Sequence, residues 1–204
     1  MEAIRVIQDE HRSLAAVVHG MLYVVHDIRD RGTNPNFELL GAMIYYIDTV
    51  PERFHHPKED QYLFRLLRIR HPDAGGVLDR LITEHETGAE KIRTLEQALT
   101  RYQQGGAAEF AAFLAAVEGY AEFHWAHMRV EEQQVLPLAR KHLLPADWEA
   151  IDAAFLGHND PLFGAEAGAG YEAYEALFRR IVLLAPPPIG VGPSTRVPQH
   201  SGRK

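Results

Sequence analysis

The sequence predicts an all-α protein built as an antiparallel up-down four-helix bundle over residues 1–145, followed by extra C-terminal helices and a disordered tail. Four long segments carry apolar residues at intervals of three and four, the spacing that lines one face of an α-helix. Short runs rich in glycine and proline separate these segments, and none shows the alternation of a β-strand. At 204 residues, the chain has the length of one domain with an appendage.

The first helix is expected to run from the N-terminus to the break made by Gly32, Asn34 and Pro35. Its apolar residues recur on one stripe, which is the face that a helix buries in a bundle. They are Ile4, Ile7, Leu14, Val18, Met21, Leu22 and Val25. Because His11 falls in the same stripe, we expect its imidazole to point into the core.

The second helix is expected from Phe37 to about Arg70, and it contains Pro51 and Pro57. Proline lacks the backbone N–H and clashes with the preceding turn, at a cost of about 3 kcal/mol in a regular helix interior. The two prolines flank a pair of adjacent histidines at residues 55–56. We therefore expect a kink or a local loosening of the helix near these histidines.

The third and fourth helices are expected at about 74–104 and 107–143, separated by a pair of glycines. His85 lies within the apolar stripe of the third helix, and His124 lies near the centre of the apolar face of the fourth. After the bundle in the sequence, residues 146–185 form the predicted extension. It is expected to contain a small helix at 145–155, a turn at 157–164 and an amphipathic helix at 171–184 that could pack on the bundle. Residues 186–204 form the predicted disordered tail, because they offer little apolar surface to bury.

The composition excludes several kinds of site. Cysteine is absent, so the chain has no disulfide, thiolate zinc site, iron–sulfur cluster or cysteine nucleophile, and any metal must be held by nitrogen and oxygen. A net charge of −7 disfavours nucleic acid and anionic membranes as partners, because both attract basic surfaces. The chain also contains 12 histidines, an unusually large number.

We expect a cytoplasmic protein without a membrane partner. The N-terminal segment is charged from its second residue and lacks the apolar stretch of a secretory signal. The longest uncharged run, residues 181–195, is interrupted by prolines and is too short to cross a bilayer. The oligomeric state is left open, and an oligomer is compatible with the sequence.

Two histidine–glutamate pairs carry the main functional signal. His55 and Glu59 lie four residues apart on the second helix, and His127 and Glu131 repeat this spacing on the fourth, so each pair shares one helix face. Two such pairs facing each other across a bundle can hold two cations with carboxylates between them. If these groups and the two inward histidines of the other helices were buried without partners, each would cost about 1–3 kcal/mol, and coordination would remove this cost.

Four blocks of the chain resemble the hemerythrin-like, or HHE cation-binding, domain: DEH (9–11), HHPKEDQYLF (55–64), TEHE (83–86) and HWAHMRVEEQQVLPLA (124–139). The resemblance covers about the first 145 residues, including the separations between the blocks. It implies a non-haem di-iron centre in which two glutamates bridge the irons and one iron keeps a position open for dioxygen. Carried over position by position, it implies the metal ligands His11, His55, Glu59, His85, His127 and Glu131.

The sequence departs from the oxygen-carrying hemerythrins, which have five histidines and two carboxylates. A second histidine one turn from His85 is missing, because Leu81 and Ala89 occupy those positions. His124 or His56 could supply the seventh ligand, and so could water or an exogenous ligand. The fourth-helix pair also has Glu at i+4 where the carriers have Asp at i+5. Manganese accepts the same ligands as iron, so iron is implied by the resemblance only.

The leading functional hypothesis is a di-iron protein that binds dioxygen or a related small diatomic molecule for storage, delivery or sensing. The alternative is a di-iron enzyme or stress-repair protein that acts on nitric oxide or peroxide or donates iron, because a missing seventh ligand would suit turnover. A third possibility is a regulatory module whose bundle responds to metal or oxygen, with residues 145–184 as the reporting surface.

Overall fold

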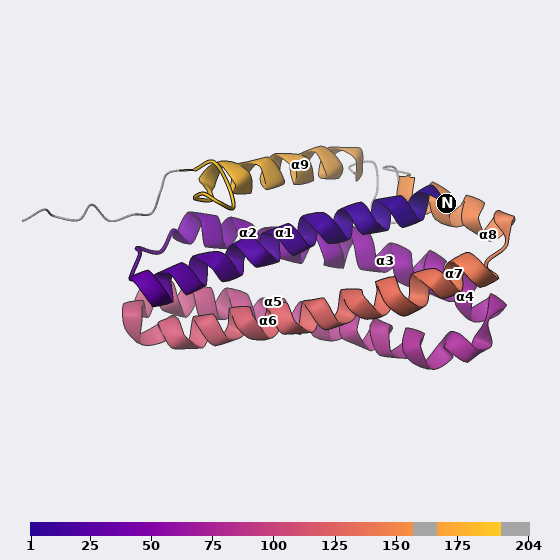
Figure 1. Ribbon diagram of the computed structural model, residues 1–204, viewed down its shortest axis with the longest axis horizontal. Coiled ribbons are helices and arrows are strands. Elements are labelled where there is room, and N and C mark those ends of the chain that lie inside the picture. Colours follow the sequence, from indigo (N-terminus) through magenta and orange to yellow (C-terminus); the bar gives the residue numbers. More distant parts are fainter. Residues whose placement is uncertain (157–166, 193–204) are drawn as a thin grey trace, which may run out of the picture.

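A computed structural model describes residues 1–156 and 167–192, with the backbone alone at 52–53 and 167–175. The described residues are helical, with no strand among them, and the long helices lie side by side as a bundle (Figure 1). The predicted all-α bundle is confirmed. The predicted turn at 157–164 lies outside the described residues. The elements in order are α1 Glu2–Arg31, α2 Phe37–Thr49, η1 Val50–His55, α3 His56–Lys58, η2 Glu59–Phe64, α4 Arg65–Arg70, η3 Pro72–Ala74, α5 Gly75–Gly105, η4 Gly106–Glu109, α6 Phe110–Val130, η5 Glu131–Val135, α7 Leu136–His142, α8 Pro145–Leu156 and α9 Ala167–Leu184.

The first turn between helices forms where the sequence predicts it. Gly32 follows α1 in the left-handed conformation, with φ 63°, and its N–H donates to the carbonyl of Ile28. Glycine adopts this conformation without the steric cost that a Cβ would impose. Asn36 then caps α2, because its side-chain oxygen accepts from the N–H of Leu39 at 3.0 Å. The chain therefore reverses within a few residues and α2 starts antiparallel to α1.

The second long helix is continuous from α2 to α4, but its middle is widened into π-helical turns. These turns, η1 and η2, surround the short α3, and Pro51 and Pro57 lie within or beside them. A π turn bonds i to i+5, and such turns often occur at functional sites. The local loosening expected from the prolines therefore takes the form of widened turns. The fourth long helix has a similar turn, η5, just before Pro137, which the sequence analysis did not anticipate.

The C-terminal helices lie outside the four-helix arrangement. α8 packs on α1, and α9 packs on α2 along the outside of the bundle (Figure 1). Ile181, near the end of α9, and Ala185, which directly follows the helix, are buried in the core. Of the predicted disordered tail, residues 193–204 lie outside the described residues. Residues 186–192 fold back on α9, where the N–H of Val191 donates to the carbonyl of Val182 at 2.9 Å.

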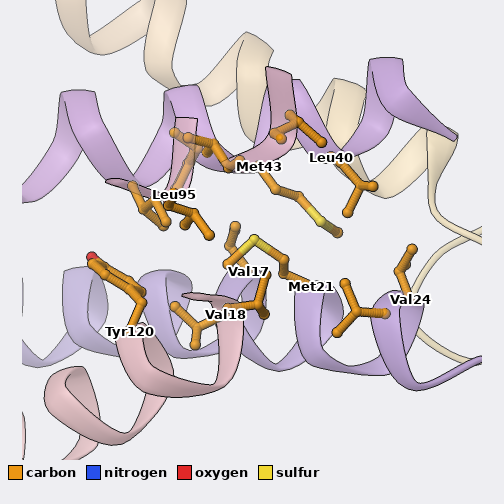
Figure 2. Packing of buried hydrophobic residues seen from close by; sticks show 14 of the residues in the cluster. Val17, Val18, Met21, Val24, Leu40, Met43, Leu95 and Tyr120 are labelled. Atoms are coloured by element: carbon orange, nitrogen blue, oxygen red, sulfur yellow. The ribbon is translucent and has the colours of Figure 1, made fainter. Parts of the chain in front are cut away.

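The core consists of two separate apolar clusters. The larger joins α1, α2, α5 and α6 at the end of the bundle that α9 covers, where Val18, Met21, Met43 and Leu95 pack face to face (Figure 2). The smaller joins the N-terminal part of α1 to α4, α7 and α8 at the opposite end. Along every long helix, the residues between the two clusters include polar side chains. No helix among the described residues is both long and apolar enough to span a membrane.

Candidate metal centre

A buried polar layer separates the two apolar clusters, and all six residues predicted as ligands lie in it. The first and third long helices each contribute one histidine, and the second and fourth each contribute a histidine and a glutamate. These residues are at most 6% exposed: His11 3%, His55 3%, Glu59 0%, His85 6%, His127 3% and Glu131 1%. The four helices therefore bring together the set that the sequence selected.

Among the described residues, the potential ligand atoms form two groups, each with all its atoms within 4.8 Å of one another. His56 belongs to one of them, so the structure brings it to the layer as a seventh potential ligand. His124 is buried but belongs to neither group. The first group is His11, His55, Glu59 and Glu131, and the second is His56, His85 and His127.

Glu131 contacts histidines of both groups. One of its oxygens, Oε2, lies 3.2 Å from Nε2 of His11, and the other, Oε1, lies 3.0 Å from Nε2 of His127. Oε1 is also 3.7 Å from Nε2 of His85. A carboxylate that offers one oxygen to each group has the arrangement needed to bridge two cations.

Glu59 repeats this arrangement from the opposite helix. Its Oε1 lies 3.3 Å from Nε2 of His55 in the first group, and its Oε2 lies 3.7 Å from Nε2 of His85 in the second. The two glutamates therefore lie between two sets of imidazoles, with two imidazoles on one side and three on the other.

The inner atoms of the layer fit a pair of cations. Both carboxylate oxygens of Glu59 and Glu131, and Nε2 of His85 and His127, are buried without a hydrogen-bond partner. Burying such atoms unsatisfied is costly, and a carboxylate more so than a neutral group. Imidazole nitrogens and carboxylate oxygens that converge on one place are the donors that iron and manganese accept. Coordination would therefore satisfy atoms whose polar neighbours in the metal-free protein are the imidazoles of the same layer.

The carboxylates change the protonation of the metal-free site. Burial alone lowers the pKa of His11, but Glu131 and Glu132 outweigh burial and raise it to about 9. Burial is likewise outweighed at His85, where Asp60 and Glu131 raise the pKa to about 10. Protons thus occupy His11 and His85 in the absence of metal, and a cation must displace them.

The pKa values of Glu131 and His56 are lowered, in contrast to those of His11 and His85. Burial raises the pKa of Glu131, but His127, His11 and His85 outweigh burial and hold it well below its usual value. At His56, burial of the ring and the neighbouring His85 lower the pKa well below its usual value. His56 is therefore neutral, as a ligand histidine must be.

Four acidic residues outside the two groups hydrogen-bond the outer nitrogens of the histidines. An ionised carboxylate only accepts hydrogen bonds, so each imidazole donates through its Nδ1–H. None of these four acids was predicted from the sequence as a hydrogen-bond partner of a histidine. The available signal was their position, since each is adjacent in sequence to a predicted ligand. The bonds are His55 to Glu10 (2.7 Å), His85 to Asp60 (3.0 Å), His127 to Glu84 (3.0 Å) and His11 to Glu132 (3.1 Å).

His124 occupies a less polar environment next to the layer. Its ring stacks on that of Tyr120, and its Nε2 is buried without a hydrogen-bond partner. Burial, followed by the nearby His127 and His11, lowers its pKa to about 3. His124 is therefore a neutral imidazole beside the candidate centre and not part of either ligand group.

A groove between α1 and α6 reaches the layer from the surface. It has a volume of about 390 Å³, and its lining includes His11, Trp125, Met128, Arg129 and Glu132. The side chain of Glu132 is 44% exposed, whereas that of His11 is 4% exposed. The hydrogen-bonded pair of His11 and Glu132 thus connects the buried layer with the solvent.

The comparisons with known proteins agree with this geometry. The model of the hemerythrin HHE cation-binding domain matches residues 2–139, which contain every residue of both ligand groups. No curated protein and no solved structure gave a significant match. The matched segment runs from the start of α1 into α7 and covers more than half of the chain. This chain belongs to the hemerythrin HHE cation-binding domain family.

Proposed function

We propose that this protein is a non-haem di-iron protein that binds dioxygen or a related small diatomic molecule, for storage, delivery or sensing. The observation that carries the proposal is the unequal division of the layer. Three imidazoles lie on one side of the two glutamates and two imidazoles on the other. With both glutamates shared, the side with His11 and His55 has one protein ligand fewer and can accept a small molecule.

The protein's own residues would each have a defined part. Glu59 and Glu131 would bridge the two ions, since each directs its two oxygens to different groups. His11 and His55 would hold the ion that binds the small molecule, and His56, His85 and His127 the other. The chemistry that a pair of iron ions held by these residues would supply is electron transfer to bound dioxygen.

The apolar clusters on both sides of the layer would exclude water. Val18, Val25 and Phe113 on one side, and Leu63 and Leu81 on the other, are fully buried. A dry site strengthens the electrostatic interactions within it and suppresses proton leakage to a bound reduced ligand. Reversible binding requires this protection, so the near-complete burial of the inner histidines and glutamates supports a binding function.

No observation favours the alternative of an enzyme or stress-repair protein over binding. That alternative depends on an absent seventh ligand, whereas His56 lies in the second group in the structure. Manganese accepts the same donor atoms, so the identity of the metal as iron is part of the proposal.

The test uses the full chain, loaded with iron(II) without oxygen. We expect about two irons per chain, as the two groups imply, and a visible charge-transfer band that appears with oxygen and disappears when oxygen is removed. The Glu118→Gln variant, altered on the surface far from the layer, should behave like the wild type. A folded, iron-loaded protein without any spectral response to oxygen would contradict the proposal. Sustained consumption of nitric oxide or peroxide with an electron donor would replace it with the enzymatic alternative.

A further inference from the structure

The four acids around the layer form a closed circuit. The acid on each long helix binds a histidine on the next helix along the chain: Glu10 on the first binds His55 on the second, Asp60 on the second binds His85 on the third, Glu84 on the third binds His127 on the fourth, and Glu132 on the fourth binds His11 on the first. We call these four acids the outer ring.

The circuit follows from the position of each acid next to an inward residue. Glu10 precedes His11, Asp60 follows Glu59, and the other two acids have the same adjacency to His85 and Glu131. Neighbouring residues on an α-helix differ in direction by about 100°. When one residue points to the centre of the bundle, its neighbour points sideways toward an adjacent helix. Each helix therefore supplies one inner group and one lateral acid.

The outer ring lies at the boundary between the layer and the solvent. The side chains of Glu10, Asp60, Glu84 and Glu132 are 15%, 31%, 18% and 44% exposed, whereas the four histidines that they bind are at most 6% exposed. Each acid can therefore contact the solvent while it holds a buried ring. A carboxylate partner keeps a hydrogen on Nδ1. The nitrogen that gives up its proton when a cation binds is therefore Nε2, which faces the two glutamates.

We propose that the outer ring positions the metal ligands: its four carboxylates hold the imidazoles with Nε2 inward and, through their negative charge, set the affinity of the site for iron and its preference for the oxidised state. This inference rests on the proposed di-iron function. The acids are positioning residues, since they act through the histidines and do not reach the candidate ions.

The outer ring also divides between the two ligand groups. Glu10 and Glu132 hold His55 and His11, the two imidazoles of the first group. Asp60 and Glu84 hold His85 and His127 of the second. Loss of Glu10 or Glu132 should therefore weaken the binding of the ion that accepts the small molecule. Loss of Asp60 or Glu84 should weaken the binding of the second ion.

The experiment separates the hydrogen bond from the charge. Glu10→Ala, Asp60→Ala, Glu84→Ala and Glu132→Ala remove both, whereas Glu10→Gln, Asp60→Asn, Glu84→Gln and Glu132→Gln keep an acceptor oxygen. The matched control is Glu118, whose Oε1 binds Nε2 of His26 at 3.0 Å, a histidine–glutamate pair outside the layer. Measurements are iron(II) affinity against a competing chelator, the reduction potential, and azide binding to the oxidised protein. Thermal unfolding of the metal-free form shows that each variant is folded.

We expect the alanine variants to bind iron about 10- to 100-fold more weakly, the typical effect of losing such an outer partner. The amide variants should keep most of this affinity but show a raised reduction potential, because they lose a negative charge beside the ligand. Azide affinity should fall more with changes at Glu10 and Glu132 than at Asp60 and Glu84. Glu118→Ala and Glu118→Gln should match the wild type.

Several outcomes would overturn the inference. If the wild type binds two irons and the folded alanine variants bind them equally well, the outer ring has no positioning role, although the proposed function stands. If the amide variants lose as much affinity as the alanine variants and their potentials do not change, charge and geometry are wrongly assigned. If the wild type fails to bind iron, the proposed function and the outer ring fall together.

Discussion

The larger apolar cluster and the polar layer lie in the same bundle but are built in opposite ways. The cluster lies mainly on regular α-helix, and residues such as Val18 and Met21 are fully buried and pack on other apolar side chains (Figure 2). The layer contains π-helical turns at two of its four helices, and Glu59 and Glu131 are equally buried but keep oxygens without partners. In the cluster burial is favourable by itself, whereas in the layer burial costs free energy that bound cations, or protons held by the histidines, must offset. The difference indicates that the cluster maintains the fold and that the layer is kept for binding.

The largest effect on the layer should come from Glu131→Ala. This side chain contacts His11, His127 and His85, so its loss removes a bridge between the two ligand groups. We expect the iron content, measured by elemental analysis after loading, to fall from about two per chain to one or fewer. Iron content equal to that of the wild type would show that this carboxylate is not a ligand. Glu118→Ala provides the control, with unchanged content.

The largest effect on the cluster should come from Leu95→Ala. Leu95 is fully buried in the larger apolar cluster. Truncation leaves a cavity, and we expect the free energy of unfolding, measured with urea in the presence of a chelator, to fall by about 2–5 kcal/mol. Iron content after loading should not change. A variant that loses iron in proportion to its stability would show that the two regions are not independent.

The layer should also give the metal-free protein an unusual dependence on pH. The raised pKa values of His11 and His85, about 9 and about 10, mean that the folded state binds protons more tightly than the unfolded state. Their stabilising contribution is full below the unfolded pKa of about 6.5 and is lost as the pH rises through 9 to 10. We expect the Tm of chelator-treated protein to fall across this range. An unchanged Tm between pH 6.5 and 10 would contradict this protonation.

The smallest effect should come from His124→Leu, at the border between the two regions. His124 belongs to neither ligand group, and its neutral ring has an unpartnered Nε2. Replacing a buried polar group by an apolar one of similar size can be nearly neutral, so we expect a change within about 1 kcal/mol. Because the pKa of His124 is lowered to about 3, its neutral ring increasingly destabilises the folded state as the pH falls below 6.5. His124→Leu should remove this dependence of stability on pH.

Metal analysis of the same variant checks the assignment of the seventh ligand. If His124 lies outside the centre, the iron content of His124→Leu equals that of the wild type, and His56→Leu lowers it. The reverse result would make His124 the ligand and His56 a neighbouring ring.

Residues that share a face of one helix could be identified from the sequence, whereas contacts between different helices could not. The periodicity of apolar residues identified the long helices, and the stripes in which His11 and His85 stand showed that these rings point inward. The i, i+4 spacing brought Glu59 to His55 and Glu131 to His127. These are relations within one helix, where the geometry of 3.6 residues per turn fixes which side chains share a face.

The choice between His56 and His124, and the circuit of the outer ring, required the folded bundle. His56 is adjacent to the inward His55, and whether its ring also reaches the layer depends on the widened turns around it and on how the helix is rotated. The partners of Glu10 and Glu84 lie on other helices, 45 and 43 residues away, and depend on how each helix is rotated about its axis. The sequence alone determined the helices and the six inward residues, because local periodicity encodes both. Only the tertiary structure decided the seventh residue and the outer ring, because helix rotation and packing bring their atoms together.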